Sequence, residues 1–333
     1  MKNNSQILIT GGTGSFGKAF VKIILKKYKP KRIVIFSRDE MKQWHMAKDF
    51  EKHSCIRYFI GDVRDKDRVY RALDGIDYVI HAAATKIVPT AEYNPFETVK
   101  TNIIGGMNVI DAAIDKNVKK VVALSTDKAC DPINFYGATK LASDKLFISS
   151  NSYSGKSRTR LSVVRYGNVM GSRGSIIPFF LETKKNGILP ITDINMTRFM
   201  ISLDSAVDLV FHAFKDMVGG EIYVKKIPSM KVVDIAKAIC PSCKIKIIGI
   251  RPGEKIHEKM ISSSDSVNTF EFKDHYKILP SMYNWSVPQK VRVGKKVKKN
   301  FEYASNTNTQ WMEVSELKNW VKKNQSFFET FYN

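Results

Sequence analysis

The sequence lacks long apolar runs: no stretch approaches the roughly 18–20 apolar residues that a membrane-spanning helix needs. The first residues, MKNNSQILIT, enter a predicted strand almost at once and leave no room for a signal peptide. Internal repeats and low-complexity segments are also missing. We therefore expect a soluble, cytoplasmic protein that has no membrane partner.

Cysteine is scarce, with 4 residues in 333. Cys240 and Cys243 form a lone C-x-x-C, without a second pair and without histidine at zinc spacing. We expect two reduced thiols near a turn there, and no metal site.

Acidic residues are outnumbered, because 54 Lys and Arg against 32 Asp and Glu give a net charge of +22. Such a charge raises the hypothesis of nucleic-acid binding, and the basic runs at 26–32 and 290–299 are dense. No signature of a nucleic-acid-binding module accompanies them. We interpret the charge as a solvated surface that attracts an anionic substrate, and predict no nucleic-acid partner.

Short β-branched runs alternate with amphipathic stretches through the first half of the chain. The predicted strands are 6–10, 32–37, 56–60, 78–81, 120–125 and 161–166. This alternation predicts an α/β fold with a doubly wound, mostly parallel sheet of the Rossmann type. Beyond about Tyr166, Pro and Gly become frequent, and we expect two further helices at 203–217 and 232–239.

We expect two domains: a dinucleotide-binding Rossmann domain over 1–167, to which later segments return, and a smaller, loop-rich substrate lobe over 168–333. The tail from about Phe270 has weak periodicity.

A glycine-rich turn follows the first predicted strand in ILITGGTGSFGKAF. Gly11 permits a tight turn, Gly14 lets the backbone approach a pyrophosphate, and Gly17 lets the next helix pack closely on the sheet. Placed between an apolar strand and an amphipathic helix, this spacing predicts a dinucleotide site. The cofactor contacts expected within the turn also include Thr13, Ser15 and Phe16.

The end of the second strand bears on the choice of cofactor. An acid there would bind the ribose 2′-hydroxyl of NAD, but this strand ends in Ser37 and Arg38. Ser37 leaves room for a 2′-phosphate, and Arg38 and Lys42 can pair with it, which favours NADP. Asp39 and Glu40 are acids close to the end of the same strand, so NAD stays possible as the cofactor.

Two further segments fit a dinucleotide. Asp62 and Val63 in GDVRD follow the third strand and are candidates for the adenine pocket. Ala82 in HAAA ends the fourth strand with a small side chain, which lets the cofactor pass over it.

Tyr136 and Lys140 are four residues apart at the start of a predicted helix, and therefore lie on one helical face. A Lys ammonium near the nicotinamide ribose would lower the Tyr pKa, and the phenolate could take a proton from a sugar hydroxyl. Thr126 supplies a hydroxyl for the reacting oxygen; its alternative role is to cap a loop.

These stretches together resemble the extended short-chain dehydrogenase/reductase superfamily. Within it the chain is similar to the inverting UDP-N-acetylglucosamine 4,6-dehydratases. The resemblance extends from about residue 6 to 261 and is carried by ILITGGTGSFGK, SRDE, FIGDVRD, HAAATKIVPTAEYNP, LSTDKA, NFYGATKLASDKLF, VVRYGNVMGSRGS, PITDINMTRF, GGEIYVKKIPSMK and GIRPGEKIHEKM.

The resemblance implies roles for Asp127 and Lys128. C4 of the sugar is oxidised, Lys128 removes the C5 proton, Asp127 protonates the departing C6 hydroxyl, and hydride returns to C6. Tightly bound NADP is thereby regenerated in each turnover, and C5 is reprotonated on the opposite face. A neutral Lys128 would need its pKa to fall from about 10.4 toward about 7–8, through burial and positive charge such as Lys140.

The resemblance also implies substrate contacts. Lys86 lies between Thr85 and Ile87, whereas relatives read Leu-Lys-His or Leu-Lys-Gln there, which bears on the shape of the sugar pocket. Asn168 is expected against the nucleotide-sugar and Val169 against the nicotinamide. Arg251 would bind the UDP diphosphate, and a structural salt bridge with Glu254 is the alternative.

The expected function is 4,6-dehydration of UDP-N-acetylglucosamine with inversion at C5, as the first step of pseudaminic acid synthesis for flagellar or other surface glycans. The alternatives are a C5-retaining dehydratase, a nucleotide-sugar 4-epimerase, and, least favoured, a non-enzymatic NADP-binding protein. Relatives are homo-oligomers, so we expect a dimer built on helices over 94–117 and 135–152, or a hexamer assembled from such dimers.

Overall fold

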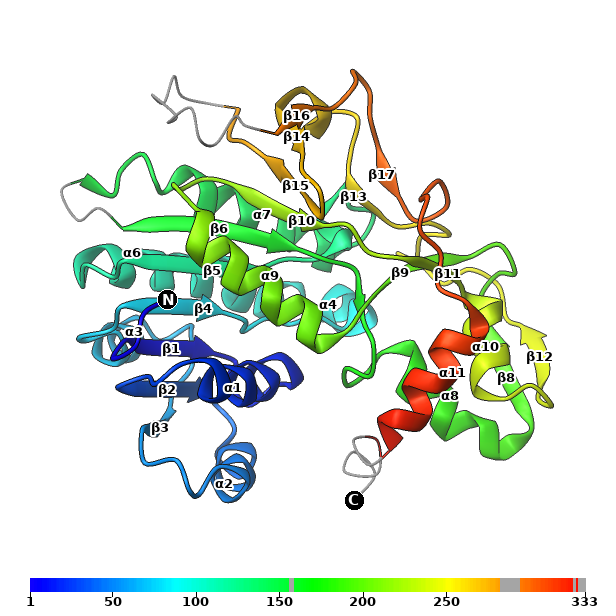
Figure 1. Ribbon diagram of the computed structural model, residues 1–333, viewed down its shortest axis with the longest axis horizontal. Coiled ribbons are helices and arrows are strands. Elements are labelled where there is room, and N and C mark those ends of the chain that lie inside the picture. The colour runs from blue at the N-terminus through cyan, green and yellow to red at the C-terminus, as the bar shows by residue number, and fades with distance from the viewer. Residues whose placement is uncertain (156–158, 282–293, 326–327, 329–333) are drawn as a thin grey trace.

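The computed structural model describes residues 1–155, 159–281, 294–325 and 328. In these residues one ten-stranded sheet has the order β16-β14-β15-β10-β6-β5-β4-β1-β2-β3 (Figure 1). The strands that run parallel to one another are β1 (Gln6–Thr10), β2 (Arg32–Ser37), β3 (Ile56–Ile60), β4 (Tyr78–His81), β5 (Lys120–Leu124), β6 (Arg160–Arg165) and β10 (Ile222–Lys225).

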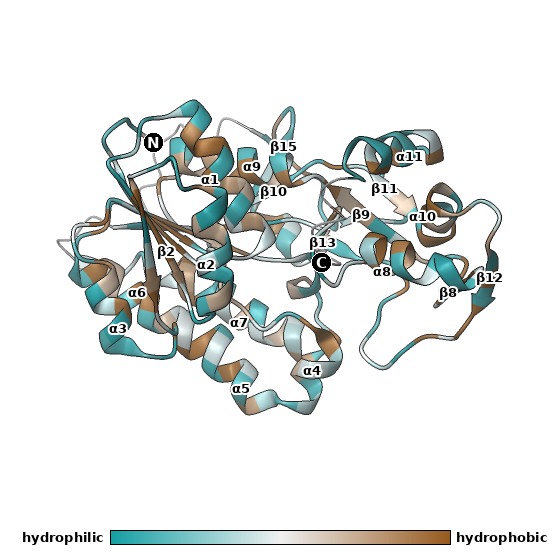
Figure 2. Ribbon diagram, turned by 90° about the horizontal axis from the view of Figure 1, so that it is seen from below, coloured by the Kyte–Doolittle hydropathy of each residue, from teal (hydrophilic) through white to brown (hydrophobic). Residues whose placement is uncertain are grey.

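Helices cover both faces of this sheet, as Figure 2 shows. One face carries α1 (Ser15–Lys27) and α9 (Leu203–Asp216), which are joined by Phe20 stacked on Phe211 at 5.1 Å between ring centroids. The other face carries α3 (Lys66–Ala72), α6 (Gly105–Asp115) and α7 (Phe135–Ser149), while α2 (Glu40–Asp49) contacts β2 and β3. Because helices cover both faces, the central parallel strands are mainly apolar, and the predicted doubly wound α/β fold is confirmed.

The predicted strand bounds agree with the structure to within one residue. The two late helices also form where expected, as α9 and α10 (Val232–Ile239). Regular β-branched runs with turn residues on both sides account for this accuracy.

The predicted helix over 94–117 is interrupted. It consists of α5 (Pro95–Val99), a π-helical turn η1 (Lys100–Ile104) and α6. Within η1, the Asn102 side chain accepts from the Thr85 N–H at 2.8 Å and donates to the Thr85 carbonyl at 3.0 Å. The wider turn therefore anchors the loop that carries Lys86.

The tail is more ordered than its weak periodicity predicts. Antiparallel strands β14 (Thr269–Glu271), β15 (His275–Ile278) and β16 (Lys295–Lys296) extend the main sheet beyond β10. Strands of two to four residues are too short to show a period in the sequence. The basic run at 290–299 lies partly outside the described residues.

A second hydrophobic core lies beyond the carboxyl ends of the parallel strands, at the right of Figure 1. It is built by α8 (Ile176–Thr183), α10 and α11 (Val314–Lys323), with Phe180, Ile235 and Leu317 fully buried. The other elements on this side are η4 (Lys184–Asn186), the parallel pair β8 (Ile188–Ile191) and β12 (Lys244–Ile247), and the three-stranded sheet of β7 (Asn168–Val169), β9 (Thr197–Ile201) and β11 (Ser229–Lys231).

The described chain also contains several short elements. They are α4 (Val88–Tyr93), the 3₁₀ turns η2 (Asp127–Ala129) and η5 (Asp265–Asn268), and the antiparallel pair β13 (Lys259–Ile261) and β17 (Tyr303–Ala304).

The prediction of two reduced thiols at the C-x-x-C is wrong: Cys240 and Cys243 form a disulfide. Helix α10 ends at Ile239 with Cys240 as its C-cap, and the Cys243 N–H donates to the Cys240 carbonyl, so the two Cα atoms lie 5.4 Å apart. That separation is ordinary for a disulfide. In the described part of the chain, no helix combines the length and the hydropathy that crossing a membrane requires.

Candidate active site

One cleft of about 1180 Å³ lies at the carboxyl ends of the parallel strands, facing the second core. In doubly wound sheets this edge is where ligands bind. Of the residues predicted at the site, all but Gly17 line this cleft: Gly11, Thr13, Gly14, Ser15, Phe16, Ser37, Arg38, Lys42, Asp62, Val63, Ala82, Lys86, Thr126, Asp127, Lys128, Tyr136, Lys140, Asn168, Val169 and Arg251.

The glycine turn has the geometry that a dinucleotide requires. Gly11 has φ +63°, and a Cβ there would lie 2.9 Å from the Ala83 nitrogen, so no other residue fits without a shift. Gly14 is the N-cap of α1, and the first residues of that helix, Ser15 and Phe16, line the cleft beside it, where a helix N-terminus favours an anion. Gly17 lies against the Gly12 carbonyl, where a Cβ would come within 2.1 Å. The cradle therefore fits a pyrophosphate.

Next to the turn, the end of β2 presents polar and basic groups. The Ser37 and Thr13 hydroxyls are 2.9 Å apart, and the Arg38 side chain is 61% exposed, with its guanidinium 3.6 Å from Asp62. Asp39 caps α2 and pairs with Lys42 at 2.6 Å, and these bonds lower its pKa. The Asp39 carboxylate is thus engaged with its own helix, and the Arg38 side chain lines the cleft next to Lys42.

The adenine candidates lie further along this wall. Burial acts to raise the pKa of Asp62, but bonds from Arg64 and the charge of Arg38 outweigh it and hold the pKa low. Asp62 is therefore an ionised hydrogen-bond acceptor, as an adenine amine would require.

Tyr136 and Lys140 project from the first turns of α7. Between them, Gly137 lies so close to η2 that a Cβ would come within 2.2 Å of the Lys128 carbonyl. This contact explains the glycine in NFYGATK, and Tyr136 and Thr126 both line the cleft beside it.

The prediction that Lys140 lowers the Tyr136 pKa is wrong for this arrangement. Burial raises the pKa of Tyr136 to about 12, and the groups that oppose it are Lys128 and Thr126. Lys140 donates to the Leu124 carbonyl at 2.8 Å, and burial lowers its own pKa.

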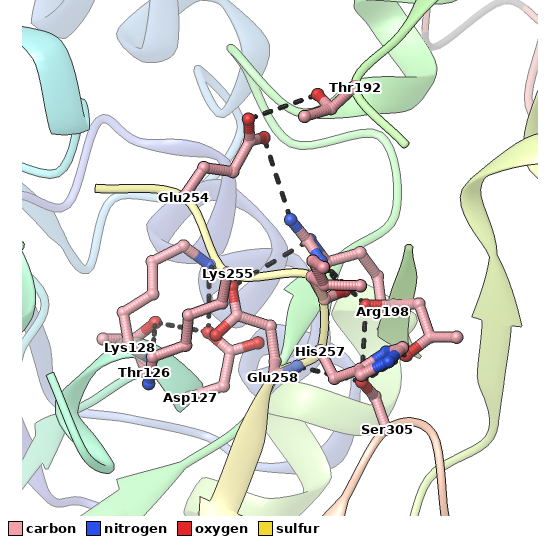
Figure 3. Close-up of polar contacts among 12 residues, drawn as sticks. Thr126, Asp127, Lys128, Thr192, Arg198, Glu254, Lys255, His257, Glu258 and Ser305 are labelled. Carbon is pink, nitrogen blue, oxygen red and sulfur yellow. Dashed lines mark hydrogen bonds and ion pairs between the residues drawn. The ribbon is translucent and has the colours of Figure 1, made fainter. Parts of the chain in front are cut away.

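Asp127 and Lys128 share the turn η2, immediately after β5. Lys128 Nζ lies 3.1 Å from Asp127 Oδ1 and also 3.1 Å from Glu258 Oε1 (Figure 3). Burial acts to lower the pKa of Lys128, but the two carboxylates outweigh it and raise the pKa. The expected fall toward neutrality is therefore wrong, because Lys140 and other cations are not its nearest neighbours.

Asp127 is 1% exposed, and burial raises its pKa above the ordinary value, against the attraction of Lys128. Its Oδ1 accepts from the Thr126 hydroxyl at 3.0 Å, while Oδ2 is buried and has no hydrogen-bond partner among the described residues. One carboxylate oxygen thus remains for a ligand.

The three predicted substrate residues are held differently. Lys86 Nζ donates to the Arg173 carbonyl at 3.0 Å, and burial lowers its pKa. Asn168 Oδ1 is buried without a partner in the described chain. Arg251 forms two bonds with Glu254, at 3.1 and 3.0 Å, so the alternative salt bridge is present.

Sequence reasoning missed Glu258 and Arg198. Glu258 is 2% exposed and Arg198 is anchored by the Thr197 and Ile256 carbonyls. Glu258 lies 130 residues after Lys128, so no local sequence pattern relates the two residues. The one sequence feature that could have indicated Glu258 is its place in GIRPGEKIHEKM, a stretch that carries the family resemblance.

The sequence profile of a family described as polysaccharide biosynthesis protein matches residues 7–280. An inverting UDP-N-acetylglucosamine 4,6-dehydratase of Campylobacter jejuni is 54% identical over 335 residues, covering 98% of this chain and 100% of the relative. A UDP-glucose 4-epimerase of Rickettsia conorii is 41% identical over 320 residues, covering 94% of each chain.

Solved structures agree with these relatives. Pen from Bacillus thuringiensis superposes with a TM-score of 0.87 at 40% identity, covering 96% of this chain and 99% of its own. DesIV from Streptomyces venezuelae, a dTDP-glucose 4,6-dehydratase solved with NAD bound, shares the fold with a TM-score of 0.69 at 18% identity, covering 98% of this chain and 99% of its own.

Proposed function

Because the chain belongs to the polysaccharide biosynthesis protein family, and within it to the inverting UDP-N-acetylglucosamine 4,6-dehydratases, we propose that it dehydrates UDP-N-acetylglucosamine with inversion at C5. The observation that carries this proposal is the ion pair of buried Asp127 and partly buried Lys128, in the same cleft as Tyr136 and a turn that fits a dinucleotide. The product is a UDP-linked 4-keto-6-deoxy sugar, and we place the reaction at the start of pseudaminic acid synthesis. We further propose that residues 1–167 mainly bind the dinucleotide and 168–333 the UDP-sugar.

The first chemical task falls to Tyr136. In its phenolate form Tyr136 removes the proton of the C4 hydroxyl, and Lys140 orients the ribose of the cofactor. When bound, the nicotinamide supplies the hydride chemistry, oxidising C4 and later reducing C6. Oxidation at C4 makes the C5 proton acidic.

Elimination then needs one base and one acid. In the ion-paired form the shared proton lies on Lys128; moving it across 3.1 Å gives a neutral Lys128 and a protonated Asp127 with the same net charge. Neutral Lys128 takes the C5 proton, and Asp127 gives its proton to the departing C6 oxygen, which leaves as water. Burial of Asp127, which raises its pKa, supports its role as the acid.

The remaining contacts are assigned to the substrate and its nucleotide. We propose that Lys86 and Asn168 bind the sugar and that Arg251 exchanges Glu254 for the diphosphate, since a guanidinium fork suits phosphate oxygens.

Proton NMR in deuterated water tests this function, with UDP-N-acetylglucosamine as substrate and no added cofactor. A new C6 methyl signal with deuterium at C5 is expected, and the C4–C5 ring couplings report inversion. The likeness to UDP-glucose 4-epimerases makes epimerisation the second candidate. An unchanged methyl region together with a UDP-N-acetylgalactosamine signal would favour the epimerase, and retained couplings would indicate a C5-retaining dehydratase.

Structural relatives bind NAD, and for this chain we propose NADP. Replacing Arg38 with Ala is expected to weaken NADP binding by about 10–100-fold, since a charged hydrogen bond contributes about 1.5–3 kcal/mol. NAD binding should change less than about threefold. Calorimetric titration of protein stripped of dinucleotide measures both constants. Arg71→Ala, an exposed site on α3 outside the cleft, is the control; equal losses for both dinucleotides in R38A would contradict the assignment.

We also propose a homodimer built on α5, α6 and α7. Along 93–107 the side chains of Tyr93 and Phe96 are 88% and 81% exposed, an unusual density of apolar surface for a monomer. Phe96→Glu, which would bury a charge in that interface, is expected to convert the dimer to a 37.8 kDa species in light scattering. Trp44→Glu, at an exposed aromatic residue on α2, should leave the mass unchanged. A wild-type protein of 37.8 kDa would refute the dimer.

A further inference from the structure

Glu258 is a buried acid next to the acid–base pair. It immediately precedes β13, and its side chain is 2% exposed. Its Oε1 lies 3.1 Å from Lys128 Nζ, while Oε2 is buried and unpartnered in the described chain. A carboxylate in this position is desolvated without full compensation, which points to a role beyond packing.

The backbone around Glu258 is fixed by the tail. The Glu258 N–H donates to Ser305 Oγ at 2.9 Å, and the Ser305 N–H donates to the Glu258 carbonyl at 2.8 Å. Ser305 Oγ lies 2.7 Å from the Thr197 hydroxyl of β9. Ser305, itself bonded to Thr197, thus fixes the backbone of Glu258, and the Glu258 carboxylate reaches Lys128 (Figure 3).

The charges around Lys128 nearly balance. The titratable and charged groups that face it are Asp127 from η2, Glu258 from the segment before β13, Arg198 from β9 and Tyr136 from α7. Arg198 lies 3.9 Å from Glu258, and Lys255 adds a further positive charge near that carboxylate. Without Glu258, Asp127 would be the one carboxylate of the described chain paired with Lys128.

We infer that Glu258 is a positioning residue for the acid–base pair: it holds Lys128 Nζ against Asp127 and keeps within the pair the one proton that elimination requires. This inference rests on the proposed dehydratase function. The pair is active while it carries one proton, is inactivated at low pH when a second proton binds, and is inactivated at high pH when the last proton leaves. A nearby anion favours proton binding in both equilibria.

The test compares pH–rate profiles for methyl formation by the full-length protein. Removing a negative charge weakens proton binding, so Glu258→Gln is expected to move both limbs of the kcat profile toward lower pH by about one unit or more. The matched control is Glu254→Gln. Glu254 also pairs with Arg198, at 3.7 Å, but it has no contact with Lys128 among the described residues. In E254Q the limbs should stay in place, whatever happens to KM.

Coincident limbs in E258Q and wild type, or equal shifts in E258Q and E254Q, would overturn the inference. If E258Q does not fold, Glu258→Asp decides: it keeps the charge but shortens the reach, so kcat should fall about tenfold or more with the limbs in place. An unchanged kcat in E258D would refute the positioning role. Failure of the wild-type protein to form any methyl product would instead reject the proposed function itself.

Discussion

Replacing Asp127 with Asn is expected to abolish formation of the C6 methyl group while oxidation at C4 continues. Asn has the shape of Asp but cannot carry the proton that the departing C6 oxygen needs, and general acid catalysis contributes about 10²–10⁴-fold. The loss should fall on kcat, because Asp127 Oδ1 keeps its neighbours Thr126 and Lys128 as an amide oxygen. The rate of methyl formation in the NMR assay measures this effect.

The same variant separates the candidate functions. Removing the Asp127 charge leaves Lys128 with Glu258 as its remaining close carboxylate, so Lys128 is more readily neutral and can still exchange the C5 proton. UDP-N-acetylglucosamine recovered from D127N in deuterated water should therefore carry deuterium at C5. Asp131→Asn, an exposed acid outside the cleft, should stay within about twofold of wild type and serves as control. Wild-type methyl formation by D127N would exclude Asp127 as the acid, and full 4-epimerisation would identify an epimerase.

Local patterns were sufficient to predict the wall of the cleft that belongs to the sheet. Gly11 and Gly14 occupy a strand–turn–helix whose geometry depends on adjacent residues. Tyr136 and Lys140 share one helical turn, so their common face follows from spacing alone. The residues that make these contacts lie within about ten positions of one another in the sequence. The strand bounds also depend on neighbouring residues, and they are predicted accurately because of this.

Contacts between distant segments could not be predicted in this way. The pKa of Lys128 depends on Glu258. The pairing of β13 with β17 and the bond from Ser305 to Thr197 of β9 place Glu258 next to Lys128. The sequence places Lys128 beside Asp127, and we expected burial and positive charge such as Lys140 to depress the Lys128 pKa; Asp127 and Glu258 together outweigh burial and raise it. The π turn at Lys100–Ile104 escaped prediction because its amphipathic pattern continues into α6, although one wider turn rotates Asn102 toward Thr85.

Replacing Tyr136 with Phe is expected to stop the reaction before C5 becomes acidic. The phenolate oxygen of Tyr136 is the base placed to accept the C4 proton, and Phe lacks that oxygen, so neither oxidation nor the later steps can begin. We expect kcat to fall by about 10²–10⁴-fold, and recovered substrate to carry no deuterium at C5. This last result distinguishes Y136F from D127N, in which exchange continues.

Burial raises the pKa of Tyr136 to about 12, and this determines how the rate of proton removal at C4 changes with pH. At neutral pH the phenol is almost entirely protonated, so proton removal at C4 should accelerate with rising pH until the acid–base pair loses its shared proton. Tyr78 begins β4, at the end of that strand far from the cleft. Tyr78→Phe is therefore the matched control and should keep wild-type exchange at C5. If Y136F exchanges the C5 proton as fast as Y78F, C4 is oxidised without Tyr136, and the base must be sought among the other groups of the cleft.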